Sequence, residues 1–164
     1  MLLDITDLLH GNCKEKLLDL TFKESNFSYA DEEIIFSEPV NIKGKLKVSK
    51  GIICLNAKVK SELLLTCSRC LEKFKYPIDL EINEKISDKV AEGDDDTIFA
   101  KDSNVDLDKI IQDNIILALP VKKLCKKDCK GLCPNCGANL NHTKCNCKND
   151  NIDPRFAKLK DLFS

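Results

Sequence analysis

The chain has few of the residues that enzymes use for acid–base chemistry. Its 164 residues include only two histidines, which is a thin supply for general acid–base catalysis. The sequence also contains no Ser/His/Asp set, no glycine-rich phosphate loop and no catalytic pair of carboxylates. We therefore expect a protein that is not an enzyme and that has no small-molecule substrate.

A long hydrophobic run is also missing. Residues 1–10 have no basic segment, and Asp4 and Asp7 interrupt their apolar residues. A stretch of this kind is neither a secretory signal peptide nor a membrane span. We expect a cytoplasmic protein with no membrane partner.

Arginine is scarce, since Arg69 and Arg155 are the only two among 26 basic residues. The formal net charge of −1 predicts no general affinity for nucleic acid. The charge is uneven, however, because residues 120–164 carry ten Lys/Arg against four Asp/Glu, a net +6, which leaves −7 for residues 1–119. The C-terminal part is therefore the better candidate for contact with an anionic partner.

Cysteine, by contrast, is abundant, and eight of the ten cysteines form four closely spaced pairs. These pairs are Cys67/Cys70, Cys125/Cys129, Cys133/Cys136 and Cys145/Cys147. In a reducing cytosol, such spacings are typical of metal ligands and not of disulfides. Eight thiolates are sufficient for two tetrahedral zinc sites. Cys13 has no partner at this spacing, and we interpret it as a plain or partly buried thiol.

The strongest metal-binding motif among these pairs is the turn Cys133-Pro-Asn-Cys136-Gly137, a form known as a zinc knuckle. Pro134 stiffens its turn, and Gly137 can adopt the positive φ that folds the chain back. One predicted site consists of the last four cysteines, Cys133, Cys136, Cys145 and Cys147. The other predicted site joins a hairpin tip to the chain that follows a helix, and consists of Cys67, Cys70, Cys125 and Cys129. The alternatives are a swapped pairing, one site with the remaining pairs free, and His142 in place of one cysteine.

Four cysteine ligands favour structural zinc, because a catalytic zinc keeps a position open for water. Iron, in a rubredoxin-like centre or an iron–sulfur cluster, is the alternative. The CxC spacing and the lack of a cluster-type cysteine run favour zinc over iron. A thiol oxidoreductase is less favoured still, because Cys67 lies at a predicted hairpin tip and not at the start of a helix.

Three runs of alternating apolar and polar residues predict three β-strands with one buried face. The runs cover residues 40–48, 53–65 and 73–86. Short connections at residues 49–51 and 67–72 predict that the strands form an antiparallel meander. The first cysteine pair then lies at a hairpin tip.

The remaining elements are predicted from shorter patterns. We expect strands at residues 16–22 and 34–36, and either a short helix or an edge segment at residues 2–9. A helix capped by Asn104 or Asp106 runs to Leu119 and covers the apolar face of the sheet. The predicted fold is α+β, with a twisted antiparallel meander or partly closed barrel under this helix and cysteine-ligated zinc sites. The predicted domains are residues 1–119 and 120–164.

Charged and amphipathic segments outside these elements have ordinary interpretations. The outer face of the meander is rich in lysine, and no aromatic residue lies among these lysines to stack a base. We interpret it as a solvated face, with phosphate contact as the alternative. The acidic run at residues 92–96 is typical of an exposed loop and lacks the ligand spacing of a calcium site. Residues 153–163 form an amphipathic pattern that favours a docking helix over a partner-binding one.

Several motifs, taken in order, resemble a known family. They are Cys-x-Arg-Cys-Leu at residues 67–71, Leu-Pro at 119–120, the two consecutive cysteine pairs within residues 124–137, Asn-Leu-Asn at 139–141, Cys-x-Cys at 145–147 and Ile-Asp-Pro-Arg at 152–155. The order is similar to that of the YceD family, the large ribosomal RNA subunit accumulation proteins, in its Gram-positive form. The resemblance covers roughly residues 40–162. It implies a cytoplasmic, non-enzymatic protein that binds metal and nucleic acid and is needed for accumulation of 23S ribosomal RNA.

The first functional hypothesis is therefore a ribosome-biogenesis factor in which zinc maintains the shape and basic side chains contact phosphate. Its partner would be ribosomal RNA or a pre-ribosomal particle, or else a ribosomal protein. The predicted RNA-binding residues are Lys122, Lys123, Lys126, Lys127, Lys130, Lys144, Lys148 and Arg69. The alternative from another class is a protein–protein adaptor stabilised by structural zinc, and a thiol or metal redox protein is the least favoured.

Overall fold

The computed structural model describes residues 1–30, 32–49, 51–88 and 97–147. The chain forms two compact units. The first unit contains Met1–Leu65 and Lys73–Lys123, and the second contains Thr66–Glu72 together with the chain from Leu124 onward. The hairpin tip with the first cysteine pair thus belongs with the C-terminal cysteines. The domain boundary at residue 119 stays a prediction.

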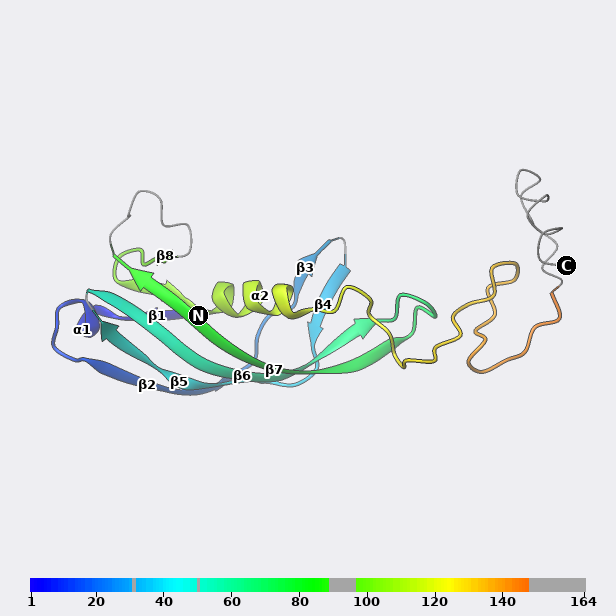
Figure 1. Cartoon of the computed structure of the whole chain (residues 1–164), viewed down its shortest axis with the longest axis horizontal. Helices are drawn as coiled ribbons and strands as arrows, with labels where there is room; N and C mark the ends of the chain where they lie inside the picture. The colour runs from blue at the N-terminus through cyan, green and yellow to red at the C-terminus, as the bar shows by residue number, and fades with distance from the viewer. Residues whose placement is uncertain (31, 50, 89–96, 148–164) are drawn as a thin grey trace, which may run out of the picture. The chain divides into compact units, whose positions relative to one another are not determined.

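A mainly antiparallel sheet forms the body of the first unit (Figure 1). Its strands are β2 (Glu15–Phe22), β3 (Phe27–Tyr29), β4 (Glu32–Phe36), β5 (Val40–Ser49), β6 (Ile52–Thr66), β7 (Lys73–Ser87) and β8 (Thr97–Phe99). The order is β2-β5-β6-β4-β3, with β7 paired to β6 and β8 paired in parallel to β7. The long strand β6 therefore pairs with three others and forms the centre of the sheet.

The three predicted long strands are present as β5, β6 and β7. Alternation places one set of side chains inward, and Ile42, Leu46, Leu55 and Val59 are completely buried. In the β5–β6 hairpin, Ile42 pairs with Val59 and Leu46 pairs with Leu55, so the inward residues of one strand lie beside those of the next. The buried face of the sheet is the direct result of this register.

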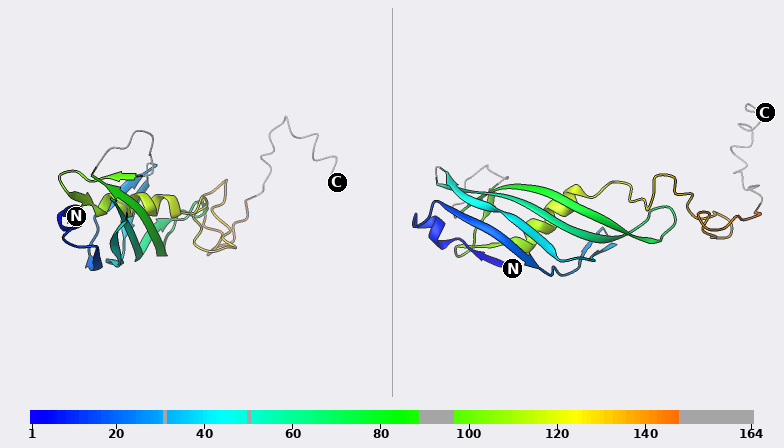
Figure 2. Two further views of the ribbon diagram at one scale, coloured as in Figure 1. Left: turned by 60° about the vertical axis from the view of Figure 1, so that its left-hand side comes forward. Right: turned by 90° about the horizontal axis from the view of Figure 1, so that it is seen from below.

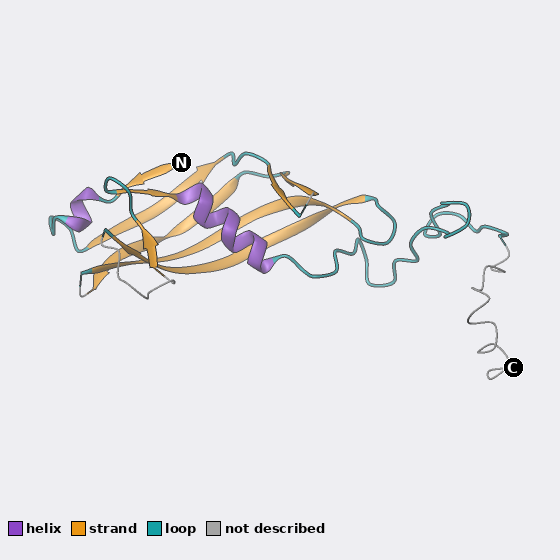
Figure 3. Ribbon diagram, turned by 90° about the horizontal axis from the view of Figure 1, so that it is seen from above, coloured by secondary structure: helices purple, strands orange, loops and turns teal. Residues whose placement is uncertain are grey.

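Helix α2 (Leu107–Ala118) covers that buried face, as the amphipathic pattern predicted (Figure 3). It begins after Asp106, whose side chain accepts a hydrogen bond from the backbone N–H of Asp108. The apolar side of the helix packs into the same core as the strands through Leu107, Ile110, Ile111 and Ile115. Two small elements precede the sheet in the chain, β1 (Leu2–Asp4) and α1 (Thr6–Leu9), and β1 pairs with β9 (Asn104–Asp106).

The sheet is open, so the prediction of a partly closed barrel is wrong. Figure 2 shows the strands curving around α2. Among the described residues, β2 pairs only with β5, and the sheet order does not return to it. Because α2 fills the concave side, the strands bury their apolar face without closing on themselves. No helix in the described part of the chain is long and apolar enough to cross a membrane.

The outer lysines of the sheet are largely matched by acidic neighbours. Lys58 and Lys60 lie 3.1 and 3.3 Å from the carboxylate of Asp79, and Lys43 lies 3.4 Å from that of Asp19. Similar pairs join Lys45 to Glu15 and Lys75 to Glu62. These ion pairs support the interpretation of a solvated face. The acidic run at 92–96 and the amphipathic segment at 153–163 lie outside the described residues.

Candidate metal centres

The two CxxC knuckles of the second unit have the same backbone hydrogen bonds. In the hairpin tip, the N–H of Cys67 donates to the carbonyl of Glu72, and the N–H of Leu71 donates to the carbonyl of Cys67. In the later knuckle, Cys133 and Gly137 make the equivalent bonds. Each knuckle has a positive φ at its fifth residue, +60° at Leu71 and +72° at Gly137. The sequence predicted a positive φ for Gly137, but it gave no indication of a positive φ at Leu71.

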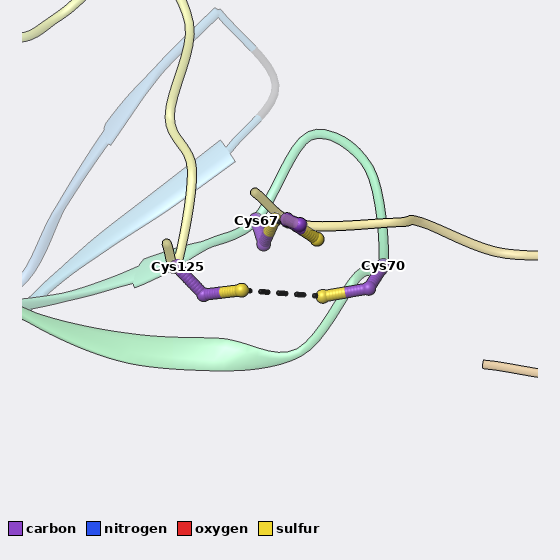
Figure 4. A group of neighbouring side chains, drawn as sticks. Cys67, Cys70 and Cys125 are labelled. Carbon is purple, nitrogen blue, oxygen red and sulfur yellow. Dashed lines mark hydrogen bonds between the residues drawn. The ribbon is translucent and has the colours of Figure 1, made fainter. Parts of the chain in front are cut away.

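The first cysteine group consists of Cys67, Cys70, Cys125 and Cys129. Figure 4 shows Cys125 directed toward Cys70, and their sulfur atoms are 3.6 Å apart. The sulfur atoms of Cys67 and Cys129 are 3.8 Å apart. The residues come from the β6–β7 hairpin tip and from the chain beyond α2, and three of the four are buried. Two segments more than fifty residues apart thus contribute equally to one group.

The second cysteine group consists of Cys133, Cys136, Cys145 and Cys147. As in the first group, its four sulfur atoms all lie within 4.8 Å of one another. It is the more exposed of the two, since only Cys133 is buried. The structure therefore brings the eight cysteines together in the arrangement that the spacing predicted.

Both groups could hold a metal ion, and two sulfur–sulfur distances in the first group suit a tetrahedral one. Zinc–sulfur bonds of about 2.3 Å place the sulfur atoms of a tetrahedral site about 3.8 Å apart. The sulfur separations of 3.6 and 3.8 Å in the first group match this geometry. The two groups could hold metal ions, and a set of four thiolates leaves no position for a reacting water.

The backbone of each knuckle favours a thiolate at its first cysteine. Burial by itself raises the pKa of the Cys67 thiol, but backbone N–H groups of Cys125, Cys70 and Arg69 outweigh it and lower the pKa to about 6. Backbone N–H groups of Cys136 and Asn135 likewise lower the pKa of Cys133 to about 6. Metal binding requires deprotonated thiols, and these backbone N–H groups favour the deprotonated form.

Polar side chains surround the first cysteine group. The side-chain amide of Asn141 donates to Cys129 Sγ at 3.3 Å and lowers the pKa of that thiol. The Arg69 guanidinium donates to the carbonyl of Cys129 at 2.8 Å. Gly131 has φ +74°, and a Cβ added there would lie 3.0 Å from the carbonyl oxygen of Arg69. These residues form a support around the thiolates that cysteine spacing alone does not reveal.

His142 belongs to neither cysteine group. Its Nε2 lies 2.9 Å from Glu72 Oε1, and this contact lowers the pKa of the Glu72 carboxyl. The other oxygen of Glu72 lies 3.6 Å from Cys70 Sγ. His142 thus contacts the surroundings of the first group, in contrast to the alternative in which it replaces a cysteine.

The basic residues predicted to contact RNA lie in different environments. Five of these lysines are exposed: Lys122, Lys126, Lys127, Lys130 and Lys144. Lys123 forms an ion pair with Glu32, and only 17% of its side chain is exposed. The guanidinium of Arg69 donates a hydrogen bond to the backbone carbonyl of Cys129. Lys148 lies outside the described residues. RNA contact by any of them stays a prediction.

Comparison with known proteins gives several relatives. The Bacillus subtilis protein described as "Uncharacterized protein YlbN" is 26% identical over 161 residues, which is 94% of this chain and 92% of that protein. The Mycobacterium tuberculosis protein "Uncharacterized protein Rv2926c" is 31% identical over 122 residues. That match covers 71% of this chain, and the chain spans 58% of the length of the mycobacterial protein.

A maize protein carries a functional description. It is "Large ribosomal RNA subunit accumulation protein YCED homolog 1, chloroplastic", 43% identical over 65 residues, which is 39% of this chain and 22% of that protein. No solved structure matches the chain. The family model of the large ribosomal RNA subunit accumulation protein YceD matches residues 55–163. This match extends over most of the chain and includes both cysteine groups, so the chain belongs to the YceD family.

Proposed function

We propose that this protein is a cytoplasmic, non-enzymatic zinc protein that supports accumulation of 23S ribosomal RNA in large-subunit assembly, by binding RNA or ribosomal components. Membership of a family named for large ribosomal RNA subunit accumulation carries the proposal. The described residues add two four-cysteine groups whose geometry suits structural metal.

In this proposal zinc takes the place of an apolar core in the second unit. The structure contains a large cluster of buried apolar side chains, and all its members lie in the first unit. In the described part of the second unit, the buried side chains are cysteines: Cys67, Cys70, Cys129 and Cys133. Structural zinc supplies folding free energy directly to segments of this kind.

Zinc also changes the charge available for RNA. A zinc ion with four thiolates carries a charge of about −2. Residues 66–72 add one Arg and one Glu to the +6 of residues 120–164, so two loaded groups lower the net charge of these two segments together from +6 to about +2. RNA affinity therefore depends on individual exposed lysines and not on the total charge. The exposed lysines next to the cysteines are Lys126, Lys127, Lys130 and Lys144.

Binding to transcribed fragments of 23S ribosomal RNA, measured at graded salt concentrations, tests this surface. We expect the logarithm of the association constant to fall linearly with the logarithm of salt concentration. Replacing one contacting lysine, for example Lys127→Gln, should reduce that slope by about one, as expected for loss of a single phosphate contact.

Lys58→Gln is the matched control, because Lys58 is already paired with Asp79 on the outer face of the sheet. It should leave both affinity and slope unchanged. Absence of salt-dependent binding by the zinc-loaded protein would contradict the proposed RNA contact.

A protein–protein adaptor is the second candidate. At the end of α2, Leu117 is 84% exposed and Val121 is fully exposed, which leaves two apolar side chains available to a partner. A ribosomal protein that stays bound to the chain after nuclease treatment, and is lost with Leu117→Ser, would favour the adaptor over the RNA-binding protein.

A further inference from the structure

A short loop of the second unit lies within the chain of the second cysteine group but contacts the first group. This bridging loop, residues 139–142, lies between Cys136 and Cys145 of the second group. Its contacts, however, are with the first group and its surroundings. They are the Asn141 amide to Cys129 Sγ at 3.3 Å, the Leu140 N–H to the Gly131 carbonyl at 2.9 Å, and His142 Nε2 to Glu72 Oε1 at 2.9 Å.

The hydrogen bonds of Asn141 determine which end of its side chain faces the sulfur. The backbone N–H of Lys130, which can only donate, lies 2.9 Å from Asn141 Oδ1. The amide NH₂ of Asn141 is therefore the end directed at Cys129 Sγ, where it meets an acceptor. The backbone N–H of Asn141 in turn donates to Asn139 Oδ1 at 3.0 Å. Asn141 is thus held as a donor to a ligand of the first group by bonds within the bridging loop and next to it.

Metal at the second group would restrain the ends of this loop. Cys136 and Cys145 flank the bridging loop, and an ion that binds both closes the chain between them. Closing the loop in advance removes part of the conformational entropy lost when Asn141 is positioned. Metal at the second group therefore favours the hydrogen bond that supports a thiolate of the first group.

We propose that Asn141 is an outer-sphere residue of the first cysteine group, and that the bridging loop makes metal binding at the two groups cooperative. The inference rests on the proposed zinc binding. Outer-sphere partners of metal ligands typically change affinity by about 10–100-fold, and we expect coupling at the lower end of that range. Because coupling between two sites is reciprocal, the first group strengthens the second by the same factor.

Zinc competition with a chelator measures the coupling. The full-length chain yields the product of its two stepwise Kd values. Two single-group variants, Cys136→Ser with Cys145→Ser and Cys67→Ser with Cys70→Ser, yield the Kd of each group alone. The product of these two separate constants, divided by the product for the intact chain, is the coupling factor. We expect about 10.

Asn141→Asp tests the role of the amide. Aspartate keeps the oxygen that accepts from Lys130 but cannot donate to Cys129 Sγ or to Asn139 Oδ1, which the amide contacts at 2.8 Å, so the coupling factor should fall to nearly one. Asn146→Asp is the matched control. This substitution introduces the same charge between two cysteines, and the side chain of Asn146 makes no hydrogen bond among the described residues. This control should keep the coupling factor.

Alkylation mapping gives a second measurement that needs no cysteine substitution. At a fixed free zinc concentration, the first-group cysteines should react faster in Asn141→Asp than in Asn146→Asp. A coupling factor of one in the unsubstituted chain, or equal behaviour of the two aspartate variants, would overturn the inference. Failure of the unsubstituted chain to bind zinc at all would instead contradict the proposed zinc binding.

Discussion

At the residue scale, the two knuckles provide a direct comparison of leucine and glycine at the same backbone position. Leu71 has φ +60° with 64% of its surface exposed, and Gly137 has φ +72°. The left-handed region costs an L-residue about 1–2 kcal/mol, whereas glycine loses about 0.5–1 kcal/mol of additional chain entropy on folding. We expect Leu71→Gly to be neutral or slightly stabilising and Gly137→Leu to destabilise its knuckle by about 1 kcal/mol.

Zinc retention at graded chelator concentrations checks both substitutions. Leu71→Ala is the control, because it removes the exposed apolar surface while keeping the unfavourable φ. If Leu71→Gly weakens zinc retention as strongly as Gly137→Leu, backbone conformation is not the deciding factor at this position.

At the element scale, Gly44 sets how closely β5 approaches β6. A Cβ added at this residue would lie 2.2 Å from the carbonyl oxygen of Asn56 and 2.5 Å from the Cα of Ala57. Both neighbours are on β6, so a side chain would force the two strands apart. We expect Gly44→Ala to lower the free energy of unfolding by about 1–3 kcal/mol, as overpacking does, measured by urea denaturation.

Gly51→Ala separates this steric effect from backbone strain. Gly51 has φ +81° in the β5–β6 turn, but a Cβ there would meet nothing within 4 Å. The control should cost only the conformational penalty of about 1 kcal/mol. A loss at Gly44 no larger than this would show that the strands can separate without cost.

At the scale of the whole molecule, the two units are stabilised by different interactions. The first unit has an apolar core of sheet and helix residues, and the buried side chains in the described part of the second unit are cysteines. We expect a strong chelator to abolish the dispersed amide NMR signals of residues 124–147 while those of β5 and β6 keep their chemical shifts. Re-addition of zinc should restore the signals. Loss of the β5 and β6 signals together with the others would contradict separate stabilisation.

Local patterns in the sequence were sufficient for the main elements and for the four cysteine pairs. Alternation in residues 40–86 predicted three strands because side chains of a strand point to opposite faces at every second residue. A cap at Asn104 or Asp106 and the apolar stripe after it predicted α2 for a similar local reason, and the structure has the cap at Asp106. Short spacings predicted the four cysteine pairs because one to three intervening residues can bring both sulfur atoms to the same side of a turn. Which pairs share a group stayed open between the expected pairing and a swapped one, and the folded chain decided it.

Only the tertiary structure decided what depends on contacts between distant segments. The open sheet, the parallel addition of β8 and the close approach at Gly44 follow from how strands pair and curve, which alternation does not encode. In the sequence Asn141 was only part of a motif shared with a family, and the folded chain identified its amide as a partner of Cys129. The sequence by itself therefore determined which residues form the main elements and which cysteines are candidate ligands. The tertiary structure decided which side chains support those groups, because hydrogen bonds between distant residues depend on folded geometry and not on spacing along the chain.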